Sequence, residues 1–216
     1  MDNIFLNAGR LIESDDPAIV AFAKNAIGEE KNPQKKALAL FYAVRDKISY
    51  DPYLPLGEIK SYSGKEALAM GKGWCVSKAA LLTACARSQN IPARPGYADV
   101  RNHIATPKLT DAMGTDIFFW HSYCELLIFD KWIKCTPSFN KTLCDKFGLK
   151  VLDFDGENDS LFHAYDKLGN RHMEYIRDRG TFPDVPYEKI VNTFCAKYRN
   201  IGAGIEGNFE AEAGQL

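Results

Sequence analysis

The chain has 216 residues, of which 46% are hydrophobic and 25% charged, and its formal net charge is −1. This composition is close to the average of globular domains and excludes a fibrous or disordered protein. The small net charge gives no electrostatic reason to expect nucleic acid or an anionic membrane as a partner. The sequence lacks both an apolar run of ~18 residues and a basic, apolar leader. We therefore expect a cytoplasmic protein.

Helices are predicted over residues 16–28, 32–48, 63–70 and 75–90. The first two begin at an Asp-Pro and an Asn-Pro pair, which cap a helix and fix its first turn. The third begins with a Ser-x-x-Glu capping box, after a proline-stiffened segment at 50–55. The fourth is rich in small and apolar residues, so we expect it to be buried in the centre of the domain.

Strands are predicted at 93–100, 118–129 and 132–136, with a tight turn at Asp130-Lys131 joining the last two into a hairpin. The polar connection at 101–116 is long, contains one short helical stretch at 110–113, and is a candidate lid or cleft wall.

The remainder of the chain is mixed. A short helix is expected at 140–147, strands at 150–154 and 173–177, and a last helix at 186–198. We expect one domain over 1–200, which consists of a helical part at about 15–70, a catalytic core at about 71–182 and a C-terminal helix at about 186–200. The tail at 201–216 is rich in Gly, Ala and Glu and is expected to be disordered.

Cys75 is the main candidate for a catalytic residue, because it lies where the glycine-containing loop 71–74 meets an apolar helix. The unpaired N–H groups and the positive dipole end of a helix N-terminus favour thiolate, the nucleophilic form. The other five cysteines are expected to be reduced, small and buried. The sequence has no Cys-x-x-Cys pair and no recognisable zinc spacing, so we expect no metal and no cofactor.

His121 is the candidate general base. Alternation along strand 118–129 places Phe119, His121, Tyr123 and Glu125 on one face. If this face meets the start of the helix at Cys75, the imidazole can take the thiol proton and later return it to a leaving group. A cysteine followed by such a histidine predicts covalent acyl chemistry.

A third polar group is needed to orient the imidazole of His121. Glu125 is ~13 Å away along the strand, at about 3.3 Å per residue, and is too distant. A turn at Asp130-Lys131 pairs Glu125 with Thr136 and leaves Asn140 opposite His121 if the strand continues. Thr136 and Asn140 are therefore both candidates, and neither is a carboxylate.

Two tryptophans and one charged cluster complete the residues of interest. Trp74 and Trp120 flank the catalytic candidates and are expected to wall a substrate groove, although core packing is the alternative. The cluster Arg177-Asp178-Arg179 is expected to be a solvated charged face.

Four segments, at 73–82, 90–94, 120–126 and 132–137, resemble the transglutaminase-like superfamily of papain-type folds. This superfamily includes bacterial cysteine peptidases and amidases, peptide N-glycanases and, more distantly, arylamine N-acetyltransferases. The resemblance covers roughly residues 40–140. It implies an α+β fold in which a cysteine on a central helix faces a histidine and an aspartate on adjacent antiparallel strands.

Carried over to this chain, the resemblance implies Cys75 as nucleophile and His121 as base, while the position of the family's aspartate falls on Thr136. The predicted function is a thiol enzyme that attacks an amide or thioester carbonyl of a peptide, protein or small amide through an acyl-enzyme, with hydrolysis favoured over transfer to an amine. The alternatives are a catalytically impaired peptide-binding module and an arylamine-type N-acyltransferase. The oligomeric state is not predicted.

Overall fold

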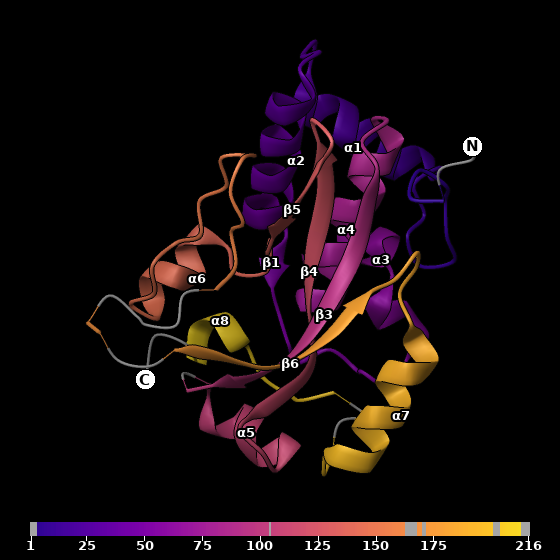
Figure 1. The fold of residues 1–216 in the computed structure, drawn as a ribbon. Helices are drawn as coiled ribbons and strands as arrows, with labels where there is room; N and C mark the ends of the chain where they lie inside the picture. Colours follow the sequence, from indigo (N-terminus) through magenta and orange to yellow (C-terminus); the bar gives the residue numbers. More distant parts are fainter. Residues whose placement is uncertain (1–3, 104, 163–167, 170–171, 201–203, 213–216) are drawn as a thin grey trace.

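The protein is described by a computed structural model that covers residues 4–103, 105–162, 168–169, 172–200 and 204–212. It combines helices with one antiparallel sheet of four strands, which confirms the predicted α+β class (Figure 1). The helices are α1 (Pro17–Ile27), α2 (Pro33–Lys47), α3 (Gly64–Met70), α4 (Cys75–Ser88), α5 (Pro107–Met113), α6 (Lys141–Lys146), α7 (Tyr187–Lys197) and α8 (Phe209–Glu212). The strands are β1 (Ser49–Tyr50), β2 (Lys72–Gly73), β3 (Ala93–Asn102), β4 (Ile117–Ile128), β5 (Lys131–Cys135) and β6 (Met173–Thr181).

Helix α4 is the centre of the fold, as predicted. It packs on β3 and β4 on one side and on α1, α2 and α3 on the other (Figure 1). Every residue from Cys75 to Arg87 is buried. The helix begins after Trp74, whose extended backbone N–H donates to the Ser77 hydroxyl at 3.2 Å. The thiol of Cys75 is therefore fixed at the first position of a helix that has protein on all sides.

The sheet has the order β5-β4-β3-β6, and its hairpin differs from the predicted one. Ile128 pairs with Lys131, so the turn residues are Phe129 and Asp130, both with positive φ (48° and 63°). Positive φ at both positions matches the twist of a two-residue hairpin. The predicted turn one residue later was wrong, and the pairing is shifted by two residues.

Two further expectations need correction. Residues 150–154 form no strand. The tail from 201 was expected to be disordered, but residues 204–212 contain α8 and bury Phe209 against the domain. The rest of that tail, 201–203 and 213–216, lies outside the described residues. Both segments are placed by contacts with distant parts of the chain, such as those of Leu152 with Arg45 and of Phe209 with Tyr53. Local composition does not contain these contacts.

Lys78 is a charged side chain inside the core, one turn after Cys75. It is fully buried, and its Nζ donates to the carbonyl oxygens of Arg45, at 3.0 Å, and Ile48, at the end of α2. Carbonyls at a helix C-terminus lack intrahelical partners and attract a cation. Burial nevertheless lowers the pKa of Lys78 to about 7, with Asp46 acting in the opposite direction.

We expect this buried lysine to make stability depend on pH. Between about pH 7 and 10.5 the unfolded chain keeps the Lys78 proton that the folded chain has lost. The free energy of unfolding should therefore rise with pH, by roughly 1 kcal/mol per unit. Urea unfolding at several pH values measures this slope, and Lys78→Met should lack it. Equal slopes in the two proteins would contradict the expectation.

Candidate active site

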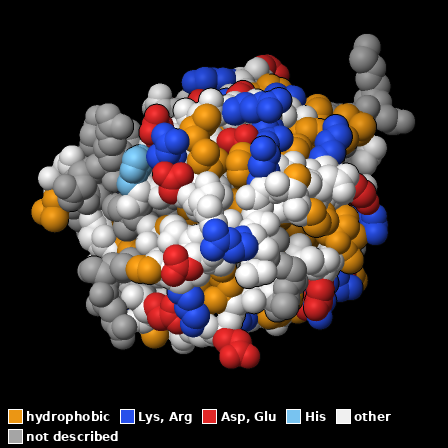
Figure 2. Space-filling model, turned by 90° about the horizontal axis from the view of Figure 1, so that it is seen from below, with side chains coloured by type: hydrophobic (Ala, Val, Ile, Leu, Met, Phe, Trp, Pro, Cys, Tyr) orange, Lys and Arg blue, Asp and Glu red, His pale blue; other side chains and the backbone are white. Residues whose placement is uncertain are grey.

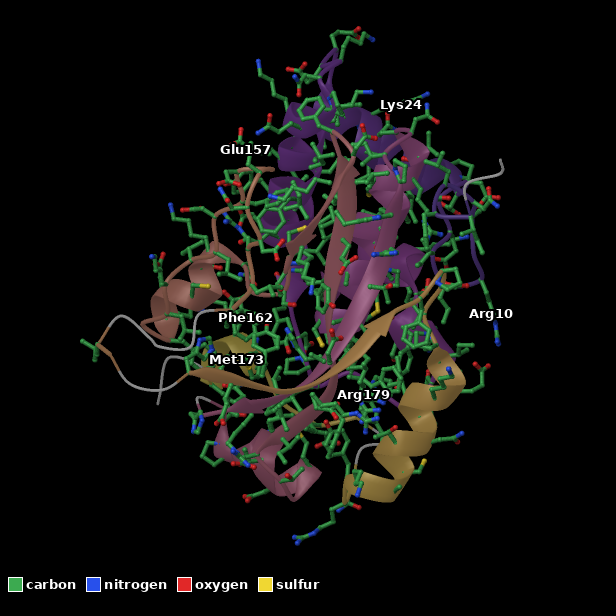
Figure 3. The ribbon with its side chains drawn as sticks, in the orientation of Figure 1. Arg10, Lys24, Glu157, Phe162, Met173 and Arg179 are labelled. Carbon is green, nitrogen blue, oxygen red and sulfur yellow. The ribbon has the colours of Figure 1, made fainter. Side chains whose placement is uncertain are left out.

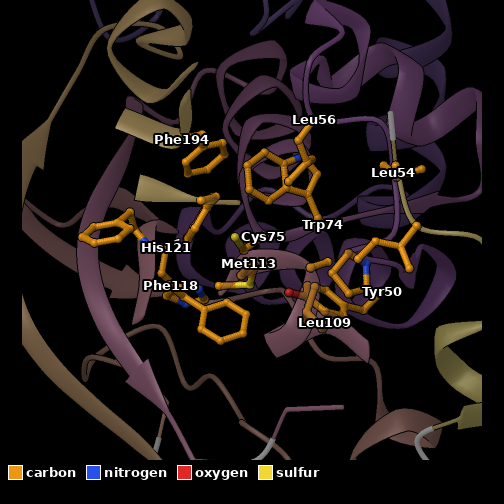
Figure 4. Close-up of a pocket in the computed structure, with 16 residues that line it drawn as sticks. Tyr50, Leu54, Leu56, Trp74, Cys75, Leu109, Met113, Phe118, His121 and Phe194 are labelled. Carbon is orange, nitrogen blue, oxygen red and sulfur yellow. Dashed lines mark hydrogen bonds between the residues drawn. The ribbon is translucent and has the colours of Figure 1, made fainter. Parts of the chain in front are cut away.

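Cys75 and His121 line the same pocket, which lies at the N-terminus of α4 (Figure 4). The pocket is apolar, with walls from the 50–56 segment, α5, β4 and α7. Its apolar lining includes Leu54, Trp74, Leu109, Met113, Phe118 and Phe194. None of the described residues that line it is an aspartate, glutamate, lysine or arginine. The fold therefore brings the two predicted catalytic residues to one site.

The environment of Cys75 favours its neutral thiol. Burial raises its pKa to about 12, although backbone N–H groups of Ser122, Val76 and Cys75 itself act in the opposite direction. The predicted stabilisation by the helix N-terminus is thus present but smaller than the cost of desolvating a thiolate. Burial thus acts against the predicted thiolate, because the prediction considered the helix and not the enclosure around it.

The environment of His121 likewise favours its neutral imidazole. Its residue is only 5% exposed, its ring lies 5.2 Å from that of Phe162, and it pairs with Ala98 across β3. Burial lowers its pKa to about 3, with His172 contributing in the same direction. Its Nε2 atom is buried and has no hydrogen-bond partner among the described residues. This nitrogen therefore has its hydrogen-bonding capacity unused among the described residues.

The predicted candidates for that partner lie beyond β5. Thr136 is buried, and its hydroxyl has no hydrogen-bond partner among the described side chains and backbone. Asn140 accepts from the N–H of Tyr50 at 3.0 Å and donates to Thr142 at 2.6 Å, which ties it to β1 and α6. The roles of Thr136 and Asn140 toward His121 stay predictions.

The corrected hairpin register adds a residue that the sequence did not indicate. Glu125 pairs with Lys134, not with Thr136, and β5 ends at Cys135. Had the strand continued in that register, Ser138 and not Asn140 would pair with His121. Ser138 is buried, and its hydroxyl lacks a hydrogen-bond partner in the described part of the chain.

The two tryptophans have different positions. Trp74 lines the pocket, and its indole N–H donates to the carbonyl of Ser61 at 2.6 Å. Trp120 is not among the lining residues; its indole N–H donates to Thr193 of α7 at 2.9 Å. Only Trp74 is thus placed as the sequence analysis expected for a groove residue.

Tyr50 is a pocket residue that the sequence analysis missed. It belongs to β1, which pairs in parallel with β2 so that Tyr50 lies beside Gly73, two residues before the candidate nucleophile. Its ring packs edge-on against Phe139, with centroids 4.7 Å apart. A two-residue strand leaves no periodic signal, so only the tertiary structure identifies this wall.

Residues 204–212, which we call the C-terminal strap, cover one side of the pocket. Gly204 and Ile205 are lining residues, and Ile205 donates its N–H to the carbonyl of Tyr53 at 3.0 Å. Phe209 is buried, with its ring 5.4 Å from that of Tyr53. Glu212 accepts from the Tyr53 hydroxyl at 2.6 Å. The strap is therefore anchored on the 50–56 segment, which lines the pocket.

The surface and the remaining side chains add little to the site. On the face shown in Figure 2, basic and acidic side chains are interspersed, in keeping with the small net charge. Within the described residues, no group of three His, Cys, Asp or Glu side chains is arranged to hold a metal ion. No helix among them is both long and apolar enough to cross a membrane.

The chain belongs to the Transglutaminase-like superfamily, whose sequence model matches residues 20–137, more than half of its length. Both Cys75 and His121 fall inside the matched region. Among solved structures, one described as a "putative cysteine protease" from Cytophaga hutchinsonii is 22% identical, with a TM-score of 0.47. That similarity covers 62% of this chain and 40% of the other, so the chain spans less than half of that protein. No curated protein matches the chain.

We expect Phe209→Ala to loosen the C-terminal strap and to raise the rate at which iodoacetamide alkylates Cys75 several-fold, because a buried thiol reacts only when the cover opens. Peptide mass spectrometry measures the rate at each cysteine. Phe129→Ala is the matched control, since Phe129 is 65% exposed at the hairpin turn. Equal alkylation of Cys75 in both variants would show that the strap does not limit access.

Proposed function

We propose that this protein is a cysteine hydrolase that cleaves an amide or thioester bond through an acyl-enzyme on Cys75. The observation that carries the proposal is the meeting of Cys75, at the first position of α4, with His121 of β4 in one apolar pocket. Membership of the Transglutaminase-like superfamily supports it, because the matched region contains both residues.

In the proposed reaction, Sγ of Cys75 attacks the carbonyl carbon while the thiol proton passes to the imidazole of His121. The backbone N–H of Cys75 stabilises the developing oxyanion. Collapse of the adduct breaks the C–N or C–S bond, and the imidazole gives its proton to the leaving group. Water then attacks the acyl-enzyme with His121 as the base, which releases the acid and restores the thiol.

The neutral resting state shapes this mechanism. Burial raises the pKa of Cys75 and lowers that of His121, and both shifts favour a proton that stays on the thiol until substrate binds. Proton transfer and attack are therefore coupled. The imidazolium of His121 forms only while Sγ bonds to the carbonyl carbon, so a separate thiolate need not exist first. A neutral third group such as Thr136 suits this scheme, because it can orient the imidazole without stabilising a permanent imidazolium.

The lining of the pocket supports an apolar acyl group as the substrate part that binds next to Cys75. Leu54, Met113 and Phe118 offer hydrocarbon surface, and a buried carboxylate would have no cationic partner among the described lining residues. We propose a peptide or small amide with an uncharged, apolar acyl side.

A non-catalytic binding module is the second candidate, and one observation favours it. The buried, protonated thiol and the threonine at the family's aspartate position are what a domain with a retained pocket and lost chemistry would show. Acyl transfer to an arylamine is the third possibility, and it differs from hydrolysis only in the group that attacks the acyl-enzyme.

An activated ester with an apolar acyl group tests the proposal. We expect turnover, a mass increase equal to one acyl group on Cys75, and loss of both in Cys75→Ser. Cys195→Ser is the matched control, because it removes the exposed thiol and should leave turnover unchanged. Addition of a primary amine separates the enzymes: an unchanged yield of acid favours the hydrolase, and an amide product that requires Cys75 favours the transferase. No adduct on Cys75 in the folded protein would favour the binding module.

A further inference from the structure

Strand β4 contains a β-bulge next to the candidate base. His121 pairs with Ala98 of β3, and the next pair is Phe118 with Val100. Asp99 therefore faces two residues, Phe119 and Trp120. Trp120 has a φ of 59°, in the left-handed region that bulky residues rarely adopt. Such bulges redirect side chains and are common beside active sites.

The bulge changes which side chains reach the pocket. In a regular strand, neighbouring residues point to opposite faces. Here Phe118 and Phe119, which are neighbours, both line the pocket together with His121. Trp120 instead packs its ring against Tyr97, with centroids 5.5 Å apart. The composition of the site around His121 thus depends on the bulge.

A buried ion pair fixes the bulge in place. The carboxylate of Asp99 accepts the backbone N–H of Trp120 at 3.1 Å and the Nε–H of Arg179 at 2.5 Å. The side chains of Asp99 and Arg179 are only 6% and 14% exposed. The guanidinium of Arg179 lies 4.4 Å from the centre of the Trp120 ring, so it also holds the indole by a cation–π contact.

The position of Arg179 also corrects an expectation. The cluster Arg177-Asp178-Arg179 was expected to be a solvated charged face. Arg177 and Asp178 are exposed, but Arg179 projects from the part of β6 beside α7 (Figure 3) and is largely buried. The ion pair is largely buried, and its carboxylate also accepts a backbone N–H. Removing either partner would therefore leave a buried charge without its counter-ion, which is energetically costly.

We infer that Asp99 and Arg179 are positioning residues for the proposed reaction: they hold the bulge at Trp120 and thereby set His121 and its two phenylalanine neighbours in the pocket of Cys75. The inference rests on the proposed function. Neither residue is placed to touch the substrate, because neither lines the pocket. Misplacing a catalytic group by about 1 Å can reduce a rate about 100-fold, so loss of the Asp99–Arg179 ion pair should lower turnover.

The test compares Arg179→Gln with Arg177→Gln, which makes the same substitution at an exposed position two residues away on β6. We expect kcat for the activated ester to fall about 10- to 100-fold in Arg179→Gln because the base is displaced, with a smaller rise in KM because Phe118 and Phe119 also shift. Arg177→Gln should match the wild type. Asp99→Asn provides the same test from the other side of the ion pair should Arg179→Gln fold poorly.

A second measurement does not depend on turnover. NMR of the imidazole signals of His121, assigned with His121→Asn, should show a shift in Arg179→Gln and none in Arg177→Gln. Identical signals and identical kcat in the two variants would overturn the inference. A third outcome combines no turnover by the wild type with His121 signals that still move in Arg179→Gln. That result would contradict the proposed reaction and support the positioning of His121 by the Asp99–Arg179 ion pair.

Discussion

The enclosure of one thiol at the start of a buried helix is the constraint on which the rest of the site depends. The helix N-terminus stabilises a negative charge on Cys75, but the surrounding protein removes the water that a thiolate requires. Desolvation is the larger effect, and it also acts against a charged His121. Burial therefore favours the neutral forms of both groups in the pocket that they share.

Side-chain contacts between distant parts of the chain support the pocket on two sides. On one side, the Asp99–Arg179 pair contacts the bulge next to His121. On the other side, the C-terminal strap closes over the segment that contains Tyr53. In the proposed mechanism, charge appears only during attack on the substrate, which an enclosed pocket favours.

Much of the fold could be predicted because its signals are local. The caps at Asp16, Asn32 and Ser63 satisfy the first N–H groups of their own helices, and they start helices where expected. The thiol at the start of α4 and the histidine strand were recognised for the same reason, since glycine, small residues and alternation lie within a few positions of them. The rest depended on contacts that no short segment contains. The hairpin register follows from Phe129 adopting a positive φ without glycine.

The bulge and the charge state of the site were equally beyond local signals. The bulge is contacted by Asp99 and Arg179, which are 80 residues apart and hydrogen-bonded to each other. The charge state of Cys75 is set by walls from several different parts of the chain. The rule that a helix N-terminus stabilises a thiolate therefore predicted one contribution to the pKa of Cys75. It missed the larger contribution, which is burial.

The central claim, a neutral Cys75–His121 pair at rest, is tested most directly by the ultraviolet absorbance of the thiolate. The difference between the wild type and Cys75→Ser, followed from about pH 5 to about pH 9, reports ionisation of this thiol alone. The account predicts no thiolate signal over this range. A signal from Cys75 near about pH 6 that disappears in His121→Asn would reveal a preformed ion pair and contradict it.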